Sequence, residues 1–148
     1  MKNTFAEDFA KLCQIKNRYL EAKSANDEAE MAAARAALKI LDDSIDAMGQ
    51  TYRNLYRLYE SAQERGNEHI DLRECYDYRD EAALIASFRE YGIETFTFSS
   101  RYSSAVESAW MFIQNGCTLK GMVEINSKTK KWEGDGYEKC PAYLFSVN

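Results

Sequence analysis

The chain contains very little proline and glycine, with one proline and seven glycines among 148 residues. Both residues interrupt regular secondary structure, so their scarcity favours long helices and strands over loops. No apolar run approaches the roughly 18 residues that a membrane-spanning helix needs. Glu7 and Asp8 stand where a secretory signal would have its apolar core. We therefore expect a cytoplasmic protein that does not associate with a membrane.

Signatures of metal sites, disulfides and catalysis are also missing. The four cysteines, Cys13, Cys75, Cys117 and Cys140, form no C-x-x-C pair, and His69 is the single histidine. Scattered free thiols suit a reducing compartment, and with one histidine they offer no metal-ligand spacing. Neither G-x-S-x-G nor H-E-x-x-H occurs in the sequence. We predict that the chain holds no metal or cofactor and is not an enzyme.

The charge balance is mildly acidic, with 19 basic and 24 acidic residues and a net charge of −5. A protein that binds duplex DNA directly usually carries a basic patch or tail, and neither is evident here. Ten tyrosines are present. So many cannot all be buried, and because tyrosine is enriched at interfaces we expect some of them to recognise a protein partner.

The N-terminal part has the pattern of a helical hairpin. Thr4 and Glu7 fit a capping box that begins a helix reaching about Lys23. After a short break, in which Ser24 with Asp27, or Asn26 alone, can cap the next helix, apolar residues recur in steps of three and four. They are Met31, Ala34, Leu38, Leu41, Ile45, Met48, Tyr52, Leu55, Tyr59 and Ala62. The phase of this seam does not slip at Gly49, which predicts one long helix from about Asp27 to Arg65.

The two predicted helices differ in length, and this mismatch leads to a predicted partner surface. The first helix would be roughly 28 Å long and the second roughly 58 Å, so the first covers the second only to about Asp46. The rest of the seam then needs a cover from the C-terminal part of the chain or from a second subunit. Arginine and tyrosine are typical of binding hot spots. The predicted partner-binding residues are Tyr52, Arg53, Tyr56, Arg57 and Tyr59.

Three alternatives remain open for that segment. Its tyrosines could be ordinary seam residues, with Arg57 paired to Glu60 or Glu64 on the same helix. The segment could hold single-stranded nucleic acid by stacking. It could also join two copies of the chain in a homodimer through residues 48–62.

The C-terminal part alternates between helical and strand patterns after a connector at residues 66–78, which could include a short extended piece around Ile70 and Leu72. We predict a helix from Asp77 or Tyr78 to Gly92 and another from a capping box at Ser104 to Gly116. Strands are predicted at 93–98, 119–126 and about 143–147, with a polar turn at 127–138. The unit spanning the first two strands should be a right-handed parallel crossover, and the last two strands an antiparallel hairpin.

The predicted fold class is therefore α+β. An antiparallel helical hairpin with a long second helix (1–65) precedes a helix–strand–helix–strand–strand unit with a small mixed sheet (79–148). At 148 residues the whole chain is close to the usual size of one domain, so we predict a single domain over 1–148.

A serine-rich loop is the best candidate for a small-ligand site. It consists of Ser99, Ser100, Arg101, Ser103 and Ser104, between a strand end and a helix start. Exposed amides at a helix start favour an anion, and Arg101 adds positive charge. The loop lacks the glycines that let backbone amides cradle a phosphate. The alternative is a polar loop that only caps the helix.

Three runs resemble a family of small uncharacterised proteins carried on mobile genetic elements of gut bacteria. They are FTFSSRYSSAVESAW from Phe96, GCTLKGMVEIN from Gly116 and YEKCPAYLFSVN from Tyr137. The resemblance covers about residues 80–148. The family has no established activity, so the resemblance implies no catalytic residues. It implies a setting in which small accessory proteins often act by binding, for example as anti-CRISPR or anti-restriction inhibitors.

Together these observations favour a non-enzymatic interaction protein that binds a protein or a protein–nucleic-acid complex and could inhibit a host defence system. The first alternative is a binder of a small phosphorylated ligand, or an enzyme acting on one, that uses the loop at 99–104. The second is a homo-oligomerising structural protein.

Overall fold

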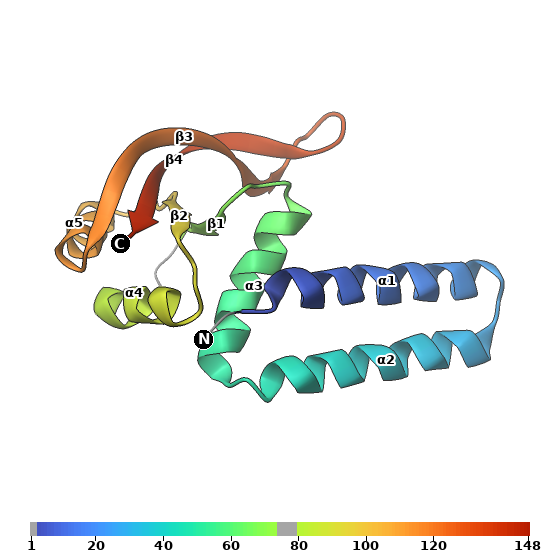
Figure 1. Cartoon of the computed structure of the whole chain (residues 1–148). Coiled ribbons are helices and arrows are strands. Elements are labelled where there is room, and N and C mark those ends of the chain that lie inside the picture. The colour runs from blue at the N-terminus through green and yellow to red at the C-terminus, as the bar shows by residue number, and fades with distance from the viewer. Residues whose placement is uncertain (1–2, 74–79) are drawn as a thin grey trace. The chain divides into compact units, whose positions relative to one another are not determined.

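The computed structural model describes residues 3–73 and 80–148 and confirms the α+β class (Figure 1). In chain order the elements are α1 (Phe5–Ser24), α2 (Glu28–Asp46), α3 (Gln50–Glu64), β1 (Ile70–Leu72), α4 (Glu81–Glu90), β2 (Thr95–Phe98), α5 (Ala105–Gln114), β3 (Cys117–Lys130) and β4 (Tyr137–Val147). None of the described helices is both long and apolar enough to cross a membrane.

The chain divides into two compact units, and the boundary falls within α3. The helical unit spans Thr4–Arg57, and the sheet unit spans Leu58–Asn148 together with Asn3. The prediction of a single domain over 1–148 stays a prediction. The predicted start of the third helix at Asp77 or Tyr78, and Cys75, lie outside the described residues.

In the helical unit, α1 and α2 form the predicted antiparallel hairpin (Figure 1). The side chain of Asp27 caps α2 by accepting a hydrogen bond from the amide of Glu30 at 3.1 Å. The capping box predicted at Thr4 is wrong, because the Thr4 hydroxyl donates to Asp8 Oδ2 at 2.9 Å and caps no backbone amide.

The prediction of one long helix over 27–65 is wrong, because the chain turns between α2 and α3. Gly49 stands at this turn with φ +102°, a backbone conformation that glycine adopts without the steric cost of a side chain. Beyond the turn, Tyr52 is 0% exposed and Tyr56 1%. The ring centroid of Phe5 lies 4.8 Å from that of Tyr52. The start of α1 therefore covers the part of the seam at Tyr52 and Tyr56, which the sequence predicts to lie open.

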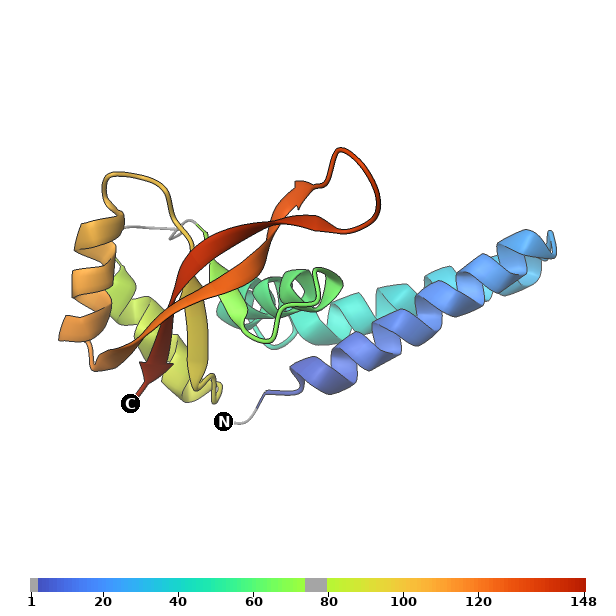
Figure 2. The same cartoon turned by 90° about the horizontal axis from the view of Figure 1, so that it is seen from above.

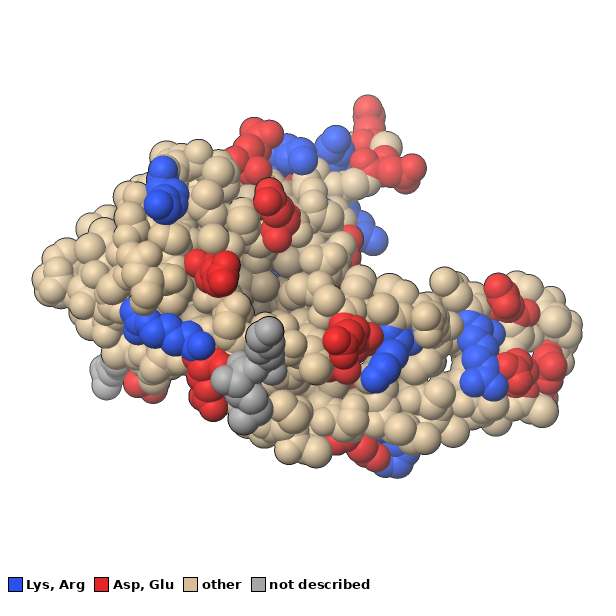
Figure 3. All heavy atoms as spheres, in the orientation of Figure 1, with Lys and Arg blue, Asp and Glu red and all other residues tan. Residues whose placement is uncertain are grey.

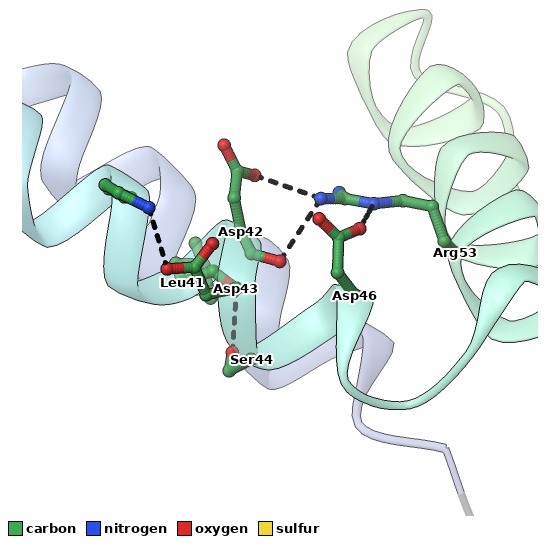
Figure 4. A network of polar contacts seen from close by, with 7 residues as sticks. Leu41, Asp42, Asp43, Ser44, Asp46 and Arg53 are labelled. Carbon is green, nitrogen blue, oxygen red and sulfur yellow. Dashed lines mark hydrogen bonds and ion pairs between the residues drawn. The ribbon is translucent and has the colours of Figure 1, made fainter.

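Arg53 fixes the corner between α2 and α3 (Figure 4). Its Nε donates to Asp46 Oδ1 at 2.6 Å, and its terminal nitrogen donates to the carbonyl oxygen of Asp42 at 3.3 Å. The hydrogen bond from Arg53 holds the pKa of Asp46 below its usual value. Arg53 thus acts within the helical unit and is not a free cation for a partner.

The sheet unit contains a four-stranded sheet in the order β1-β2-β4-β3. The predicted antiparallel hairpin of the last two strands is confirmed, and it forms the long twisted ribbon in Figure 2. β1 is parallel to β2, whereas β4 is antiparallel to both β2 and β3. β2 and β3 therefore run parallel, as predicted, but β4 lies between them.

An aromatic core fills one face of this sheet. Phe96 and Phe98 on β2 and Phe145 on β4 point to the same side, since side chains alternate along a strand. Phe88 from α4 and Phe112 from α5 pack against them, with ring centroids 5.2 Å apart for the Phe88–Phe96 and Phe96–Phe112 pairs. α4 and α5 accordingly lie together on one side of the sheet (Figure 2).

The ends of the two helices agree only partly with the sequence predictions. Gly92 and Gly116 follow α4 and α5 closely, as predicted. The capping box at Ser104 is wrong, because this residue already has helical backbone angles (φ −72°, ψ −5°) and its side chain caps no amide.

Candidate anion-binding pocket

The face of the sheet opposite the aromatic core carries polar side chains near the carboxyl ends of β1 and β2. Asp71 is paired in register with Thr97, one residue along from the core pair of Ile70 and Phe96. Because alternate residues share a face, Arg73, Ser99 and Arg101 continue this polar row just beyond the strand ends. Ligands of open sheets with parallel strands commonly bind beyond these carboxyl ends.

An irregularity in the hairpin of β3 and β4 adds more polar groups on the same face. The register shifts between Asn126 and Lys130, so three residues of β3, 127–129, stand opposite Glu138 alone. Bulges of this kind re-aim side chains and are frequent beside functional sites. Ser127, Lys128 and Thr129 all line the hollow that results.

We call this hollow the basic pocket, and its volume is about 70 Å³. It is lined by Arg65, Asp71, Arg73, Ser99, Arg101, Ser127, Lys128, Thr129, Glu138, Lys139 and Cys140. Five of these residues are basic and two are acidic. Apart from the buried Arg65, the basic residues are exposed, and none makes an ion pair with another residue in 3–73 or 80–148. The pocket therefore has an excess of positive charge.

Asp71 is the buried carboxyl group of the pocket, with a residue exposure of 4%. It accepts hydrogen bonds from the hydroxyl of Thr97 at 2.7 Å and from that of Ser99 at 2.6 Å. Burial raises the pKa of Asp71, while the two hydroxyls and the charges of Arg65 and Lys128 act in the opposite direction. The carboxyl group links β1 to the start of the serine-rich loop and holds Ser99 beside the pocket.

Arg65 is held in place by the backbone of β3. It is buried, and it donates to the carbonyl oxygen of Asn126 at 3.1 Å. Asn67 makes a reciprocal pair with the same residue, donating to its carbonyl at 3.0 Å and accepting from its amide at 2.9 Å. These bonds join the end of α3 to β3 beside the bulge and give the charge of Arg65 a fixed position.

The described part of the pocket offers no activated thiol and no metal ligand set. Cys140 is buried, and this burial raises the pKa of its thiol despite the nearby charges of Arg101, Arg65 and Arg73. Within residues 3–73 and 80–148, no three His, Cys, Asp or Glu residues form a group that could hold a metal ion.

Two residues of the predicted serine-rich site line the basic pocket, namely Ser99 and Arg101. Ser100, Ser103 and Ser104 do not line it; the Ser100 hydroxyl instead accepts from the amide of Tyr102 at 3.3 Å. No finding tests whether an anion binds there. The sequence alone does not predict that Arg65, Arg73 and the two lysines of the β3–β4 hairpin, Lys128 and Lys139, join them in this pocket.

The predicted tyrosine–arginine surface requires a correction. Tyr52 and Tyr56 are buried and Arg53 is paired, so these three residues do not form an exposed patch. Arg57 is exposed and Tyr59 half-buried. The predicted dimer through residues 48–62 depends on an uncovered seam, but Phe5 packs against Tyr52 and Tyr56 within the helical unit. Whether any of these residues contacts a partner stays untested.

Comparison with known proteins places part of the chain in a known family. A family model described as a domain of unknown function (DUF7698) matches residues 54–147, more than half of the chain. The matched range includes every residue of the basic pocket and excludes α1 and α2. No curated protein and no solved structure matches the chain.

Proposed function

The chain belongs to the DUF7698 family, a domain of unknown function, and on that premise we propose that it is a non-enzymatic binding protein that holds a phosphate-like anion in the basic pocket. One observation carries this proposal. Five basic side chains from separate segments meet at a single small hollow, and two carboxylates oppose them. Like charges repel each other, so gathering them lowers the stability of the folded protein unless a bound anion balances them.

The size of the pocket indicates how much of a ligand it accepts. A volume of about 70 Å³ has room for one tetrahedral oxyanion but not for a nucleotide or a sugar. The remainder of the ligand must therefore lie outside, which suits a phosphate group carried by a larger partner. Arg73 and Arg101 stand on exposed segments and can form the paired hydrogen bonds that guanidinium groups make with phosphate.

The non-enzymatic part of the proposal is supported by the state of the two possible nucleophiles. The Ser99 hydroxyl donates a hydrogen bond to Asp71, so the same hydrogen is not available to a bound anion. The thiol of Cys140 stays protonated near neutral pH because burial raises its pKa. Binding without covalent chemistry is therefore the simplest use of this site.

The resemblance to accessory proteins of mobile elements supports a narrower form of the proposal. In this form, the chain inhibits a host defence system by binding a protein–nucleic-acid complex, and a backbone phosphate of the nucleic acid enters the pocket. If the protein contacts a single phosphate, a plot of log Kd against log salt concentration should have a slope close to one. A surface that contacts several successive phosphates would give a slope several times larger.

Calorimetry with inorganic phosphate at constant ionic strength tests the pocket directly. Arg101→Gln removes one exposed charge and should weaken phosphate binding by about 10- to 100-fold, because a charge-assisted hydrogen bond contributes roughly 1.5–3 kcal/mol. Arg57→Gln changes another exposed arginine, in the helical unit, and is the matched control, which should leave the affinity unchanged. Equal phosphate affinities for the wild type and Arg101→Gln would refute the proposal.

A further inference from the structure

α5 is apolar on two opposite sides, although only one of them faces the sheet. Phe112 and Ser108 are buried against the sheet unit. On the other side, Val106, Trp110 and Ile113 are 79%, 58% and 45% exposed. A helix that is apolar all round normally has both sides covered. Figure 3 shows the surface over α5 and the start of β3 almost free of charged atoms.

The three exposed residues have the spacing of a helix that inserts into a groove. Positions i, i+4 and i+7 form one stripe along a helix, and peptides that bind in apolar grooves use this stripe as their anchors. Tryptophan is also among the residues most enriched at binding hot spots. Within α5 the single charged residue is Glu107, next to the stripe.

The same chain contains a groove that fits such a stripe. An apolar hollow of about 360 Å³ lies between α1 and α2, lined by Ile15, Lys16, Tyr19, Leu20, Ala34, Arg35 and Leu38. The small residue Ala34 on α2 lines it together with larger residues of α1. Since benzene fits a cavity of about 150 Å³, this hollow has room for an indole ring. Figure 3 shows a narrow opening between the two helices with basic side chains beside it.

We infer that α5 of one copy docks in the α1–α2 groove of a second copy. Two independent matches support a second copy as the occupant. The exposed stripe is apolar, and apolar side chains make up most of the lining of the groove. Their charges are also complementary, because Lys16 and Arg35 line the groove and Glu107 is the charge beside the stripe. A head-to-tail contact of this kind closes into a small oligomer or grows into a chain.

This contact differs from the dimer predicted through residues 48–62 and does not depend on the basic pocket. Unlike a symmetric contact, it joins two different surfaces. Each contact needs one intact α5 and one intact groove, and the two can come from different molecules. A variant with a damaged α5 surface and a variant with a damaged groove should therefore each lose self-association, but the two should associate with each other when mixed.

Sedimentation velocity over a range of concentrations up to about 0.5 mM tests the inference with two variants. Trp110→Gln removes the central anchor, and Leu20→Glu places a carboxylate at the groove, where Leu20 is 58% exposed. We expect the wild type to associate with increasing concentration and each variant to associate at least about tenfold more weakly. An equimolar mixture of the two variants should form a one-to-one complex.

Two exposed residues away from the contact provide controls. Trp132→Gln and Ile40→Gln replace side chains that are 96% and 71% exposed, and both variants should associate like the wild type. Circular dichroism checks that all variants remain folded. A wild type that stays monomeric, a mixture that does not form the complex, or Leu20→Glu associating as the wild type does would each overturn the inference. The last result would indicate a symmetric contact between two α5 helices.

Discussion

Substituting Gly49 by alanine distinguishes a continuous helix from the observed corner between α2 and α3, because the two predict opposite changes in the free energy of unfolding. Within a continuous helix, alanine would stabilise the protein by roughly 0.5–1 kcal/mol. In the structure Gly49 has φ +102°, and beyond the two neighbouring residues no atom lies within 4 Å of the position that an added Cβ would occupy. The substitution then causes no clash, and backbone strain alone should lower the free energy of unfolding by about 1–2 kcal/mol.

Urea unfolding followed by far-ultraviolet circular dichroism measures this change. Trp110 and Trp132 both lie in the sheet unit, so tryptophan fluorescence would not follow the helical unit. With a typical urea dependence of 1–3 kcal/mol per molar, the midpoint should fall by roughly 1 M. Ala36→Gly, at an exposed position inside α2, calibrates the assay with an expected loss of about 1 kcal/mol. Stabilisation by Gly49→Ala would refute the corner and restore the long helix.

Two further predictions concern the sheet unit and can be measured by tryptophan fluorescence. Asn67→Ala should lower the free energy of unfolding by about 1–3 kcal/mol, because it removes both hydrogen bonds to the backbone of Asn126 beside the bulge; an unchanged midpoint would mean that water replaces them. Asp71→Asn should change the pH dependence of stability. Burial raises the pKa of Asp71, so between its unfolded and folded pKa values the native state binds more protons, and stability falls as pH rises. The asparagine variant should lose this component, and equal slopes above pH 4 would contradict it.

The hydrophobic spacing predicted the elements well but not the path between α2 and α3. The steps of three and four continue through Gly49 with no change of phase, so the pattern fits both a straight helix and two helices that each bury the same stripe. What decides between them is tertiary. Phe5 covers Tyr52, and Arg53 bonds back to Asp46, and neither contact can be derived from local periodicity. The prediction of an open seam failed for this reason.

The basic pocket had a partial signal in the sequence. Asp71 and Arg73, and likewise Ser99 and Arg101, are spaced two residues apart at strand ends, which places each pair on one face. The prediction of the serine-rich loop rests on the helix start that follows it instead, so it includes Ser103 and Ser104, which do not line the hollow. The contributions of β3 and β4 depend on the register shift after Asn126, which no turn signal in the sequence indicates.

The two faces of the sheet differ in a way that packing alone does not explain. One face buries five phenylalanine rings, which form the apolar core of the sheet unit. The other face buries Asp71, whose ionised form is disfavoured there, and collects five basic residues around it. A sequence selected only for stability would have no reason to keep this arrangement, since an apolar residue would remove the desolvation cost. Local violations of this kind concentrate at functional sites, and in the proposed function a bound anion balances the excess of positive charge around Asp71.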